Sequence, residues 1–143
     1  MPTCLVDVNV WLAILRPEHP HHVPARAWYR VLPPNHAGLC RFVQLSVIRL
    51  LGNKTVMGHA AKSAAAAWEV VLELMEDERV ELVHEPPGLD SILPTLLRYR
   101  TPTPSLINDA YLAAFAIASG RRLATLDRGF EQFPGLELEI LGL

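Results

Sequence analysis

Cysteine and long apolar runs are both scarce in this 143-residue sequence. The only two cysteines, Cys4 and Cys40, lie in apolar segments and form no CxxC pair, so we interpret them as reduced core residues. This excludes a disulfide framework and argues against a structural zinc site. No apolar run approaches the roughly 20 residues that span a bilayer, and the N-terminus has neither the basic region nor the cleavage site of a signal peptide. We therefore expect a cytoplasmic protein that does not associate with membranes.

Basic residues are not in excess either. The 13 lysines and arginines stand against 15 acidic residues, which gives a formal net charge of −2. Non-specific affinity for nucleic acid rests on neutralising phosphates, so this balance argues against a promiscuous RNA binder. A selective nuclease is still compatible with it, because a bound metal and a local arginine patch can supply the positive field. Arg41, Arg49 and Arg128 are the arginines we expect to contact phosphate, although most surface arginines are only solvated.

Hydrophobic residues make up 50% of the sequence, which is on the apolar side for a globular chain. The length suits one unit, and we expect residues 1–143 to form a single domain with its own core. In so small a domain, surplus apolar surface often ends in a subunit or partner interface. The composition therefore favours a homodimer.

Short apolar segments alternate with segments of helical periodicity along most of the chain. The pattern predicts five strands, over residues 3–6, 37–40, 79–84, 122–126 and 136–141. It predicts helices over residues 8–15, 24–32, 42–51, 59–78, 89–99 and 108–119. Residues 18–24, which include three histidines, are expected to form a solvated loop. The alternation favours an α/β fold with a parallel sheet.

Three aspartates stand where this geometry brings them together. Asp7 and Asp127 each come directly after an apolar strand, and the ligands of an open parallel sheet bind beyond the carboxyl ends of its strands. The helix that begins near Asp109 is about 17 Å long, about the length of the strand before Asp127. Because Gly120 turns the chain back between helix and strand, Asp127 should return to the end at which Asp109 lies. Three carboxylates would then share one edge of the sheet.

Carboxylates held this close repel one another, and a hard divalent cation such as Mg²⁺ or Mn²⁺ relieves the repulsion. A water on such a metal loses a proton more easily and can attack a phosphodiester. Asn9 and Thr125 lie beside the acids and could orient them or hold a metal-bound water. Each acid also has a purely structural explanation. Asp109 suits the first turn of a helix, and Asp7 and Asp127 suit turns after strands.

The segments around these acids resemble the PIN-domain family, in particular the toxin branch of bacterial VapBC toxin–antitoxin pairs. The resemblance rests on Asp7-Val8-Asn9-Val10-Trp11-Leu12-Ala13, Asn108-Asp109-Ala110-Tyr111-Leu112-Ala113-Ala114 and Thr125-Leu126-Asp127-Arg128-Gly129-Phe130. It implies a three-layer α/β/α sandwich with a central parallel sheet of about five strands. It also implies an endoribonuclease that depends on Mg²⁺ or Mn²⁺, a homodimer, and inhibition by a cognate antitoxin. The family's acids map onto Asp7, Asp109 and Asp127.

One position departs from the family pattern. The family usually places a fourth acid, often glutamate, on the helix after the second strand, and here Gln44 stands at the expected position. An amide can coordinate a cation through its oxygen but brings no charge, which puts a second metal in doubt. We expect Gln44 to support the site beside the three aspartates.

Two other functions remain open from the sequence. The first is a PIN-fold binding module with impaired catalysis that acts through an antitoxin-like partner or RNA, which Gln44 and the net charge favour. The second is an unrelated α/β hydrolase or phosphatase with Asp7 as its nucleophile, although the second acid of a phosphotransferase is missing. Metal-dependent cleavage of RNA, with Asp7→Asn as control, separates a nuclease from the first. A trapped aspartyl-phosphate would identify the second.

Overall fold

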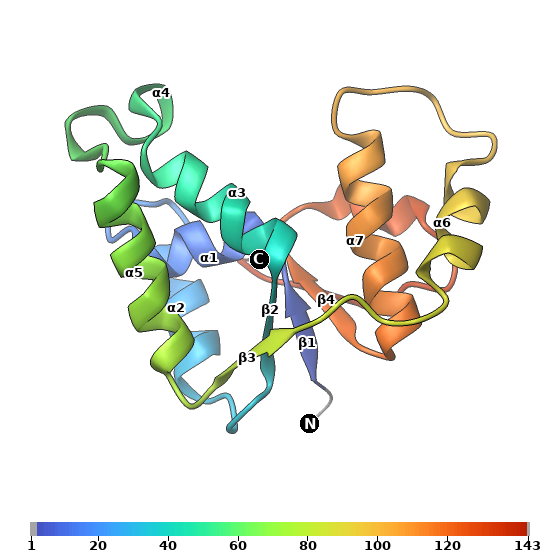
Figure 1. Ribbon diagram of the computed structural model, residues 1–143, viewed down its shortest axis with the longest axis horizontal. Coiled ribbons are helices and arrows are strands. Elements are labelled where there is room, and N and C mark those ends of the chain that lie inside the picture. Colours follow the sequence, from blue (N-terminus) through green and yellow to red (C-terminus); the bar gives the residue numbers. More distant parts are fainter. Residues whose placement is uncertain (1–2, 143) are drawn as a thin grey trace.

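The computed structural model of the chain describes residues 3–142 and is built around a five-stranded parallel sheet (Figure 1). The strands are β1 (Cys4–Val6), β2 (Ala37–Cys40), β3 (Val80–Val83), β4 (Arg122–Thr125) and β5 (Leu138–Ile140). They lie in the order β3-β2-β1-β4-β5, and every neighbouring pair is parallel. The expected parallel sheet is therefore confirmed. Its five carboxyl ends meet at one edge, with β1 in the middle.

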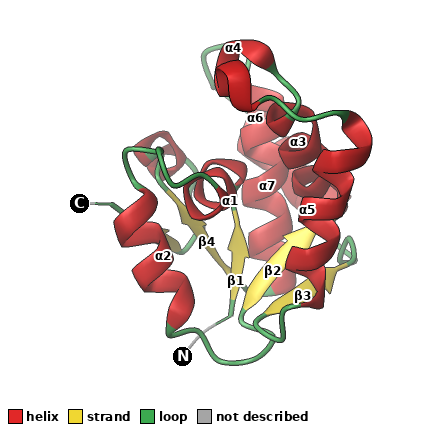
Figure 2. Ribbon diagram, turned by 90° about the vertical axis from the view of Figure 1, so that its left-hand side faces the viewer, coloured by secondary structure: helices red, strands yellow, loops and turns green. Residues whose placement is uncertain are grey.

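Helices cover both faces of this sheet (Figures 1 and 2), which confirms the expected α/β/α sandwich. One layer holds α1 (Val8–Leu15), α2 (His22–Arg30), α3 (Arg41–Leu51) and α5 (Ala64–Glu76). The other holds α6 (Leu89–Leu97) and α7 (Leu106–Ser119). The chain advances from β1 through β2 to β3 and then turns back to β4. Because crossovers between parallel strands are right-handed, the helices of the return path lie on the opposite face.

Several helix boundaries differ from the sequence prediction, among them the ends of α5, α6 and the start of α7, and the largest difference is at the start of α5. The helix predicted over residues 59–78 begins only at Ala64, as α5: it is preceded by α4 (Lys54–Met57) and by a 3₁₀ turn, η1 (Gly58–Ala60). The reason is local capping, since the Asn53 side chain accepts hydrogen bonds from Thr55 and Val56 and the Ser63 side chain caps α5. α2 begins at His22 instead of at residue 24, so the predicted loop is shorter than expected.

The apolar residues of the sequence fill a core on both sides of the sheet. Its largest fully buried side chains include Trp11 of α1, Tyr29 of α2, Phe115 of α7 and Phe130. Cys4 and Cys40 are both buried and unpaired with each other, as expected. No helix within residues 3–142 is long and apolar enough to cross a membrane.

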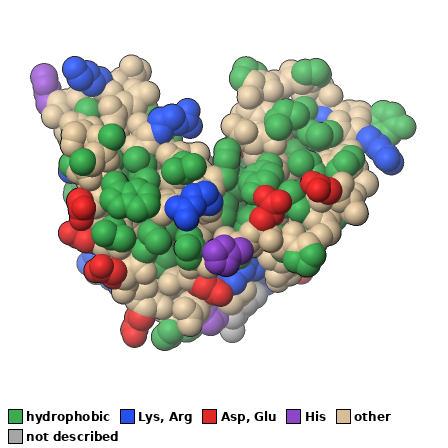
Figure 3. Space-filling model, viewed as in Figure 1, with side chains coloured by type: hydrophobic (Ala, Val, Ile, Leu, Met, Phe, Trp, Pro, Cys, Tyr) green, Lys and Arg blue, Asp and Glu red, His purple; other side chains and the backbone are tan. Residues whose placement is uncertain are grey.

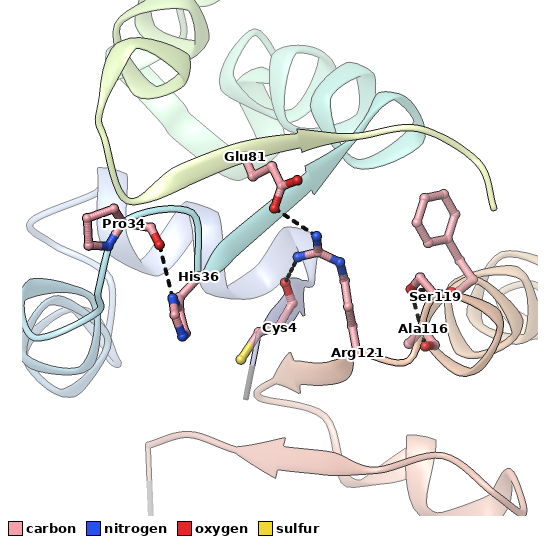
Figure 4. A network of polar contacts seen from close by, with 8 residues as sticks. Cys4, Pro34, His36, Glu81, Ala116, Ser119 and Arg121 are labelled. Atoms are coloured by element: carbon pink, nitrogen blue, oxygen red, sulfur yellow. Dashed lines mark hydrogen bonds and ion pairs between the residues drawn. The ribbon is translucent and has the colours of Figure 1, made fainter. Parts of the chain in front are cut away.

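An arginine links β1 and β3 through hydrogen bonds near the amino-terminal ends of the strands (Figure 4). Arg121, just before β4, crosses the neighbouring strands and donates to the Glu81 carboxylate of β3 at 2.8 Å and to the Cys4 carbonyl oxygen of β1 at 3.4 Å. It passes over Gly38 of β2, where a Cβ atom would lie 2.6 Å from the Cys4 oxygen and 3.1 Å from the guanidinium. Glycine at this position therefore makes room for the crossing, and Arg121 has a structural role away from the carboxyl edge.

Candidate active site

The three aspartates line one cleft of about 290 Å³ at the carboxyl edge of the sheet. Asp7 directly follows β1, Asp127 follows β4 by two residues, and Asp109 lies in the first turn of α7. The structure thus brings together the acids that the strand and helix lengths predicted to meet. Figure 3 shows that the surface is notched between the side of the molecule that carries α3 and the side that carries α6 and α7.

Asp7 is the most buried of the three acids, with 7% of its surface exposed. Its Oδ2 accepts a hydrogen bond from the Thr125 hydroxyl at 2.8 Å, and its Oδ1 accepts one from the Val8 backbone N–H at 2.7 Å, which caps α1. The pKa of this carboxyl is raised from 3.8 to about 6. Desolvation is the main cause, the hydrogen bonds from Thr125 and Val8 oppose it, and the charges of Asp109 and Asp127 add to it. Asp7 is therefore a carboxylate whose charge lacks compensation.

Asp109 and Asp127 are more accessible. Asp109 is half-buried, and its pKa is raised first by desolvation and then by the charge of Asp127. Asp127 is exposed, and its Oδ1 accepts from the Gly129 backbone N–H at 2.8 Å, where it caps the 3₁₀ turn η2 (Arg128–Gln132). Within residues 3–142 no salt bridge includes any of the three aspartates. The cleft therefore carries negative charge that the described side chains leave unpaired.

Thr125 connects Asp7 with the backbone of Asp127 through hydrogen bonds of its hydroxyl. This residue is fully buried at the end of β4, and its hydroxyl donates to Asp7 while accepting from the Asp127 backbone N–H at 3.1 Å. Asn9 completes the link. Its Nδ2 donates to the Thr125 hydroxyl at 3.4 Å and its Oδ1 accepts from the Leu126 backbone N–H at 3.2 Å. Two of the three residues predicted to support the site, Asn9 and Thr125, are thus hydrogen-bonded to the segments that carry the acids.

Gln44 does not support the site in the way we expected, and the structure corrects this prediction. Its side chain is fully buried away from the aspartate cleft, where Oε1 accepts from the Arg41 guanidinium and Nε2 contacts the Met75 sulfur of α5 at 3.0 Å. The cleft is lined by Phe42 and Ser46 of α3 instead. Residues two apart on a helix are separated by about 200° around its axis, so these two positions and Gln44 face different ways.

Replacing Ser46 should therefore test the fourth-acid position better than replacing Gln44. Ser46→Glu adds a carboxylate to the cleft and should tighten Mn²⁺ binding at least about tenfold, because a fourth charge attracts the ion further. Gln44→Glu places a carboxylate oxygen against the Met75 sulfur, so it should leave Mn²⁺ affinity unchanged and cost on the order of 1–3 kcal/mol of stability. Calorimetric Mn²⁺ titration and thermal unfolding of both variants measure this. If only Gln44→Glu binds Mn²⁺ more tightly than wild type, position 44 and not position 46 faces the metal site.

The predicted phosphate contacts separate into three groups. Arg49 of α3 is exposed and lines the aspartate cleft. Arg128 directly follows Asp127 in the sequence and is exposed, but its guanidinium forms a salt bridge with Glu131 at 2.8 Å. Arg41 lines neighbouring hollows instead of the cleft itself. Other cleft residues were not singled out from the sequence, among them Ser46 and Ser105.

The donor set suits a hard divalent cation, although it is not a closed cage. Among residues 3–142 no three acidic, histidine or cysteine side chains converge closely enough to enclose a metal by themselves. Mg²⁺ is usually held by one or two carboxylates with several waters, so an open arrangement with two accessible aspartates and one buried one fits it. Oxygen ligands without sulfur or imidazole also favour Mg²⁺ or Mn²⁺ over zinc.

Comparison with known proteins identifies the family. The PIN domain family model matches residues 4–136, so this chain belongs to the PIN-domain family. Its relatives include the protein named Ribonuclease VapC41 of Mycobacterium tuberculosis, which is 37% identical over 142 residues that cover 96% of this chain and 97% of the relative. Ribonuclease VapC29 of the same species is 31% identical and covers 93% and 92% of the two chains.

Solved structures show the same fold. The toxin–antitoxin complex VapBC2 of Rickettsia felis, bound to a promoter DNA fragment, contains a chain that superposes with a TM-score of 0.69 at 14% identity, over 98% of this chain and 99% of that one. VapC20 of Mycobacterium tuberculosis, described as a toxin that cleaves the sarcin–ricin loop, superposes with a TM-score of 0.65 at 22% identity, over 94% and 99%. At these identities the likeness concerns the fold alone.

Proposed function

We propose that this chain is a metal-dependent endoribonuclease and the toxin component of a type II toxin–antitoxin pair. The observation that carries the proposal is the cleft at the carboxyl edge, which Asp7, Asp109 and Asp127 line together and where no side chain of residues 3–142 forms a salt bridge with them. Relatives that are named ribonucleases and cover nearly the whole chain support it.

The described side chains can divide the work of phosphodiester hydrolysis. A divalent cation bound by the aspartates would lower the pKa of a coordinated water and stabilise charge on the phosphate. Thr125 and Asn9 hold Asp7 and the backbone before Asp127 in fixed positions, which keeps the carboxylates oriented. Arg49 on the cleft wall is placed to contact a phosphate and to offset the acidic edge. Arg49 is the one basic residue among the described side chains that line the cleft, so the three aspartates keep it acidic until a cation binds.

Cleavage of RNA by the purified chain tests the activity. We expect single-stranded RNA to be cut when Mn²⁺ or Mg²⁺ is present and to remain intact when EDTA removes the metal. A protein that binds RNA or a partner but cuts nothing with either ion would favour the binding module with impaired catalysis.

The antitoxin partner is supported by the structural neighbours, one of which is described as a toxin–antitoxin complex and three of which are named VapBC. A disordered tail of such a partner could lie along the notch and cover the aspartates. The protein encoded beside this chain is the candidate. Co-expression should yield a complex that does not cleave RNA with Mn²⁺, and a neighbour that neither binds nor inhibits would contradict the partner.

A homodimer is supported by an apolar face on α3 and α5. Leu45 is 54% exposed and Trp68 is 39% exposed, and Leu72 and Met75 are half-buried on the same helix as Trp68. Figure 3 shows a broad group of hydrophobic side chains on the side of the molecule that carries α3 and α5. Residues four and seven apart on a helix share a face, so this surface is continuous along α5.

Trp68→Glu should weaken the dimer at least about thirtyfold, since a buried aromatic anchor commonly contributes 2 kcal/mol or more. Light scattering over a range of protein concentrations measures the monomer fraction. Tyr99→Glu is the matched control, because this aromatic residue is fully exposed just beyond α6, in the helix layer on the opposite face of the sheet. A wild-type chain that is monomeric at all concentrations without a partner would rule out the homodimer.

A further inference from the structure

A second hollow lies beside the aspartate cleft along the same edge of the sheet. It encloses about 110 Å³ between the end of β3, the start of α3 and the first half of α7, and we call it the side pocket. Its walls include Arg41, Glu85, Tyr111 and Phe115. A shallower depression continues from the side pocket toward the aspartates, and it shares Arg41, Glu85 and Tyr111 with that pocket. It is also lined by Phe42 and Asn108, which line the aspartate cleft as well.

The strand order explains why the side pocket adjoins the candidate active site. Going along the edge from β3 to β4, the residues that lie one or two positions beyond the ends of the strands include Glu85, Arg41, Asp7 and Asp127. Neighbouring strands are about 4.8 Å apart, so the end of β3 lies about 10 Å from the end of β1. An RNA strand whose phosphate reaches the aspartates would therefore extend an adjoining nucleotide over the side pocket.

Both charged groups of the side pocket are anchored and yet accessible. The Tyr111 hydroxyl donates to Glu85 Oε2 at 2.9 Å, and the Arg41 guanidinium donates to Gln44, whose amide is completely buried against Met75. Glu85 and Arg41 are exposed, and within residues 3–142 neither takes part in a salt bridge. Each therefore keeps hydrogen-bonding capacity for a ligand: the carboxylate can accept further bonds, and the guanidinium has five N–H donors.

Aromatic rings supply the remaining wall. The Tyr111 ring contacts Phe42 edge-to-face at a centroid distance of 5.5 Å and Phe115 at 6.1 Å. Unpaired RNA bases stack on such side chains and present their edges to hydrogen-bonding groups. The apolar and charged walls thus complement the two parts of a nucleobase.

We propose that the side pocket binds the base of a nucleotide adjoining the scissile phosphate and that it favours guanine. Guanine offers N1–H and N2–H donors side by side, which a carboxylate such as Glu85 can accept, and O6 and N7 acceptors that suit an arginine. Adenine presents an acceptor at N1 where guanine has a donor, so it would oppose the carboxylate. Gln44 acts in this pocket as a positioning residue that holds Arg41. This inference rests on the proposed ribonuclease function, because a base beside the scissile phosphate is defined only if the protein cleaves RNA.

The test compares short single-stranded RNAs that differ in one nucleotide beside the cut, carrying guanine, inosine or adenine. With Mn²⁺ we expect guanine to exceed adenine in kcat/KM by about tenfold to a hundredfold. Inosine lacks the N2 amino group and should fall between them. Glu85→Gln should bring the guanine-to-adenine ratio close to one while cleavage of the adenine RNA continues, and Arg41→Gln should lower the ratio as well.

Two control variants and a binding measurement complete the design. Glu78→Gln and Arg30→Gln remove matched charges at the opposite end of the sheet and should keep the wild-type ratio. Fluorescence anisotropy of the same RNAs in EDTA measures binding without cleavage, and thermal unfolding checks that each variant is folded.

Each outcome addresses one claim. A wild-type protein that cuts no RNA overturns the proposed function. The ratio of its affinities for the guanine and adenine RNAs, measured by anisotropy, then still shows whether the side pocket prefers guanine. A guanine-to-adenine ratio that folded Glu85→Gln leaves unchanged overturns the base subsite while the nuclease stands. Variants that lose affinity for the neighbouring gene product but keep the wild-type RNA ratio also overturn it, since the pocket would then serve a protein partner.

Discussion

Replacing Asp109 with asparagine should lower the rate of metal-dependent RNA cleavage at least about a hundredfold and leave the fold intact. Loss of one carboxylate from a metal site removes several kcal/mol of stabilisation of the charged transition state, and each 1.4 kcal/mol is a factor of ten in rate. The side chain keeps its volume, and because repulsion and desolvation already raise the pKa of Asp109, its loss should not destabilise the protein. Cleavage under single-turnover conditions with Mn²⁺ measures the effect.

Asp127→Asn should behave in the same way, because asparagine can still accept the hydrogen bond from Gly129. Glu78→Gln, at the opposite end of the sheet, is the control and should cut at the wild-type rate. An Asp109→Asn protein that cleaves normally would remove this residue from the catalytic assignment. If the wild type and the Glu78→Gln control cleave RNA as fast in EDTA as in Mn²⁺, cleavage does not depend on a divalent metal.

Much of the active-site edge could be predicted because it depends on local sequence alone. The apolar strands β1 and β4 end next to Asp7 and Asp127, and strand ends of a parallel sheet must lie together. The return of Asp127 to Asp109 followed from the lengths of one helix and one strand, with the turn at Gly120, whose φ of 68° suits glycine. These features need no knowledge of distant contacts.

The orientation of α3 could not be obtained in this way. Its periodicity predicted a helix, but the face that looks toward the cleft is set by packing against Met75 of α5, 31 residues further along the chain from Gln44. Family spacing pointed to Gln44, while the structure places Ser46 at the cleft. The interruption before α5 was missed because the alanine-rich segment has high helix propensity and the caps Asn53 and Ser63 outweigh it locally.

The side pocket had a signal that the sequence analysis did not use. Glu85 stands just beyond the predicted strand over residues 79–84, as Asp7 and Asp127 stand beyond theirs. The same argument about strand ends would have placed it at the carboxyl edge. Its partner Tyr111, which is 26 residues away, needed the structure, because α6 and the loops on either side of it separate β3 from α7 along the chain.

Asp7→Asn should make the metal-free protein more stable at neutral pH. The folded-state pKa of Asp7 is raised from 3.8 to about 6, so the folded protein holds this proton more tightly than the unfolded chain does. Stability from this group is then fully present below pH 4 and is lost as the pH rises through about 6. The change corresponds to about 3 kcal/mol at pH 7. We expect a net gain of on the order of 1–2 kcal/mol, because the asparagine amide would face the Thr125 hydroxyl, which already accepts two hydrogen bonds.

Divalent metal should reverse this order of stability. An ion that binds only the folded wild-type protein stabilises it by about 2.7 kcal/mol at a hundredfold excess over its dissociation constant. Asp7→Asn lacks a charged ligand and should gain much less. Urea unfolding at pH 4 and pH 7, with EDTA or with Mn²⁺, gives the four values for each protein. In EDTA the advantage of Asp7→Asn should disappear at pH 4, where the wild-type carboxyl is protonated in the folded state. Wild type should then be the more stable by about 1–2 kcal/mol, because the unfavourable contact of the amide with the Thr125 hydroxyl remains. A variant that is less stable than wild type in EDTA at pH 7 would show that the hydrogen bonds of Asp7 outweigh its buried charge, and equal stabilisation of both proteins by Mn²⁺ would place the ion away from Asp7.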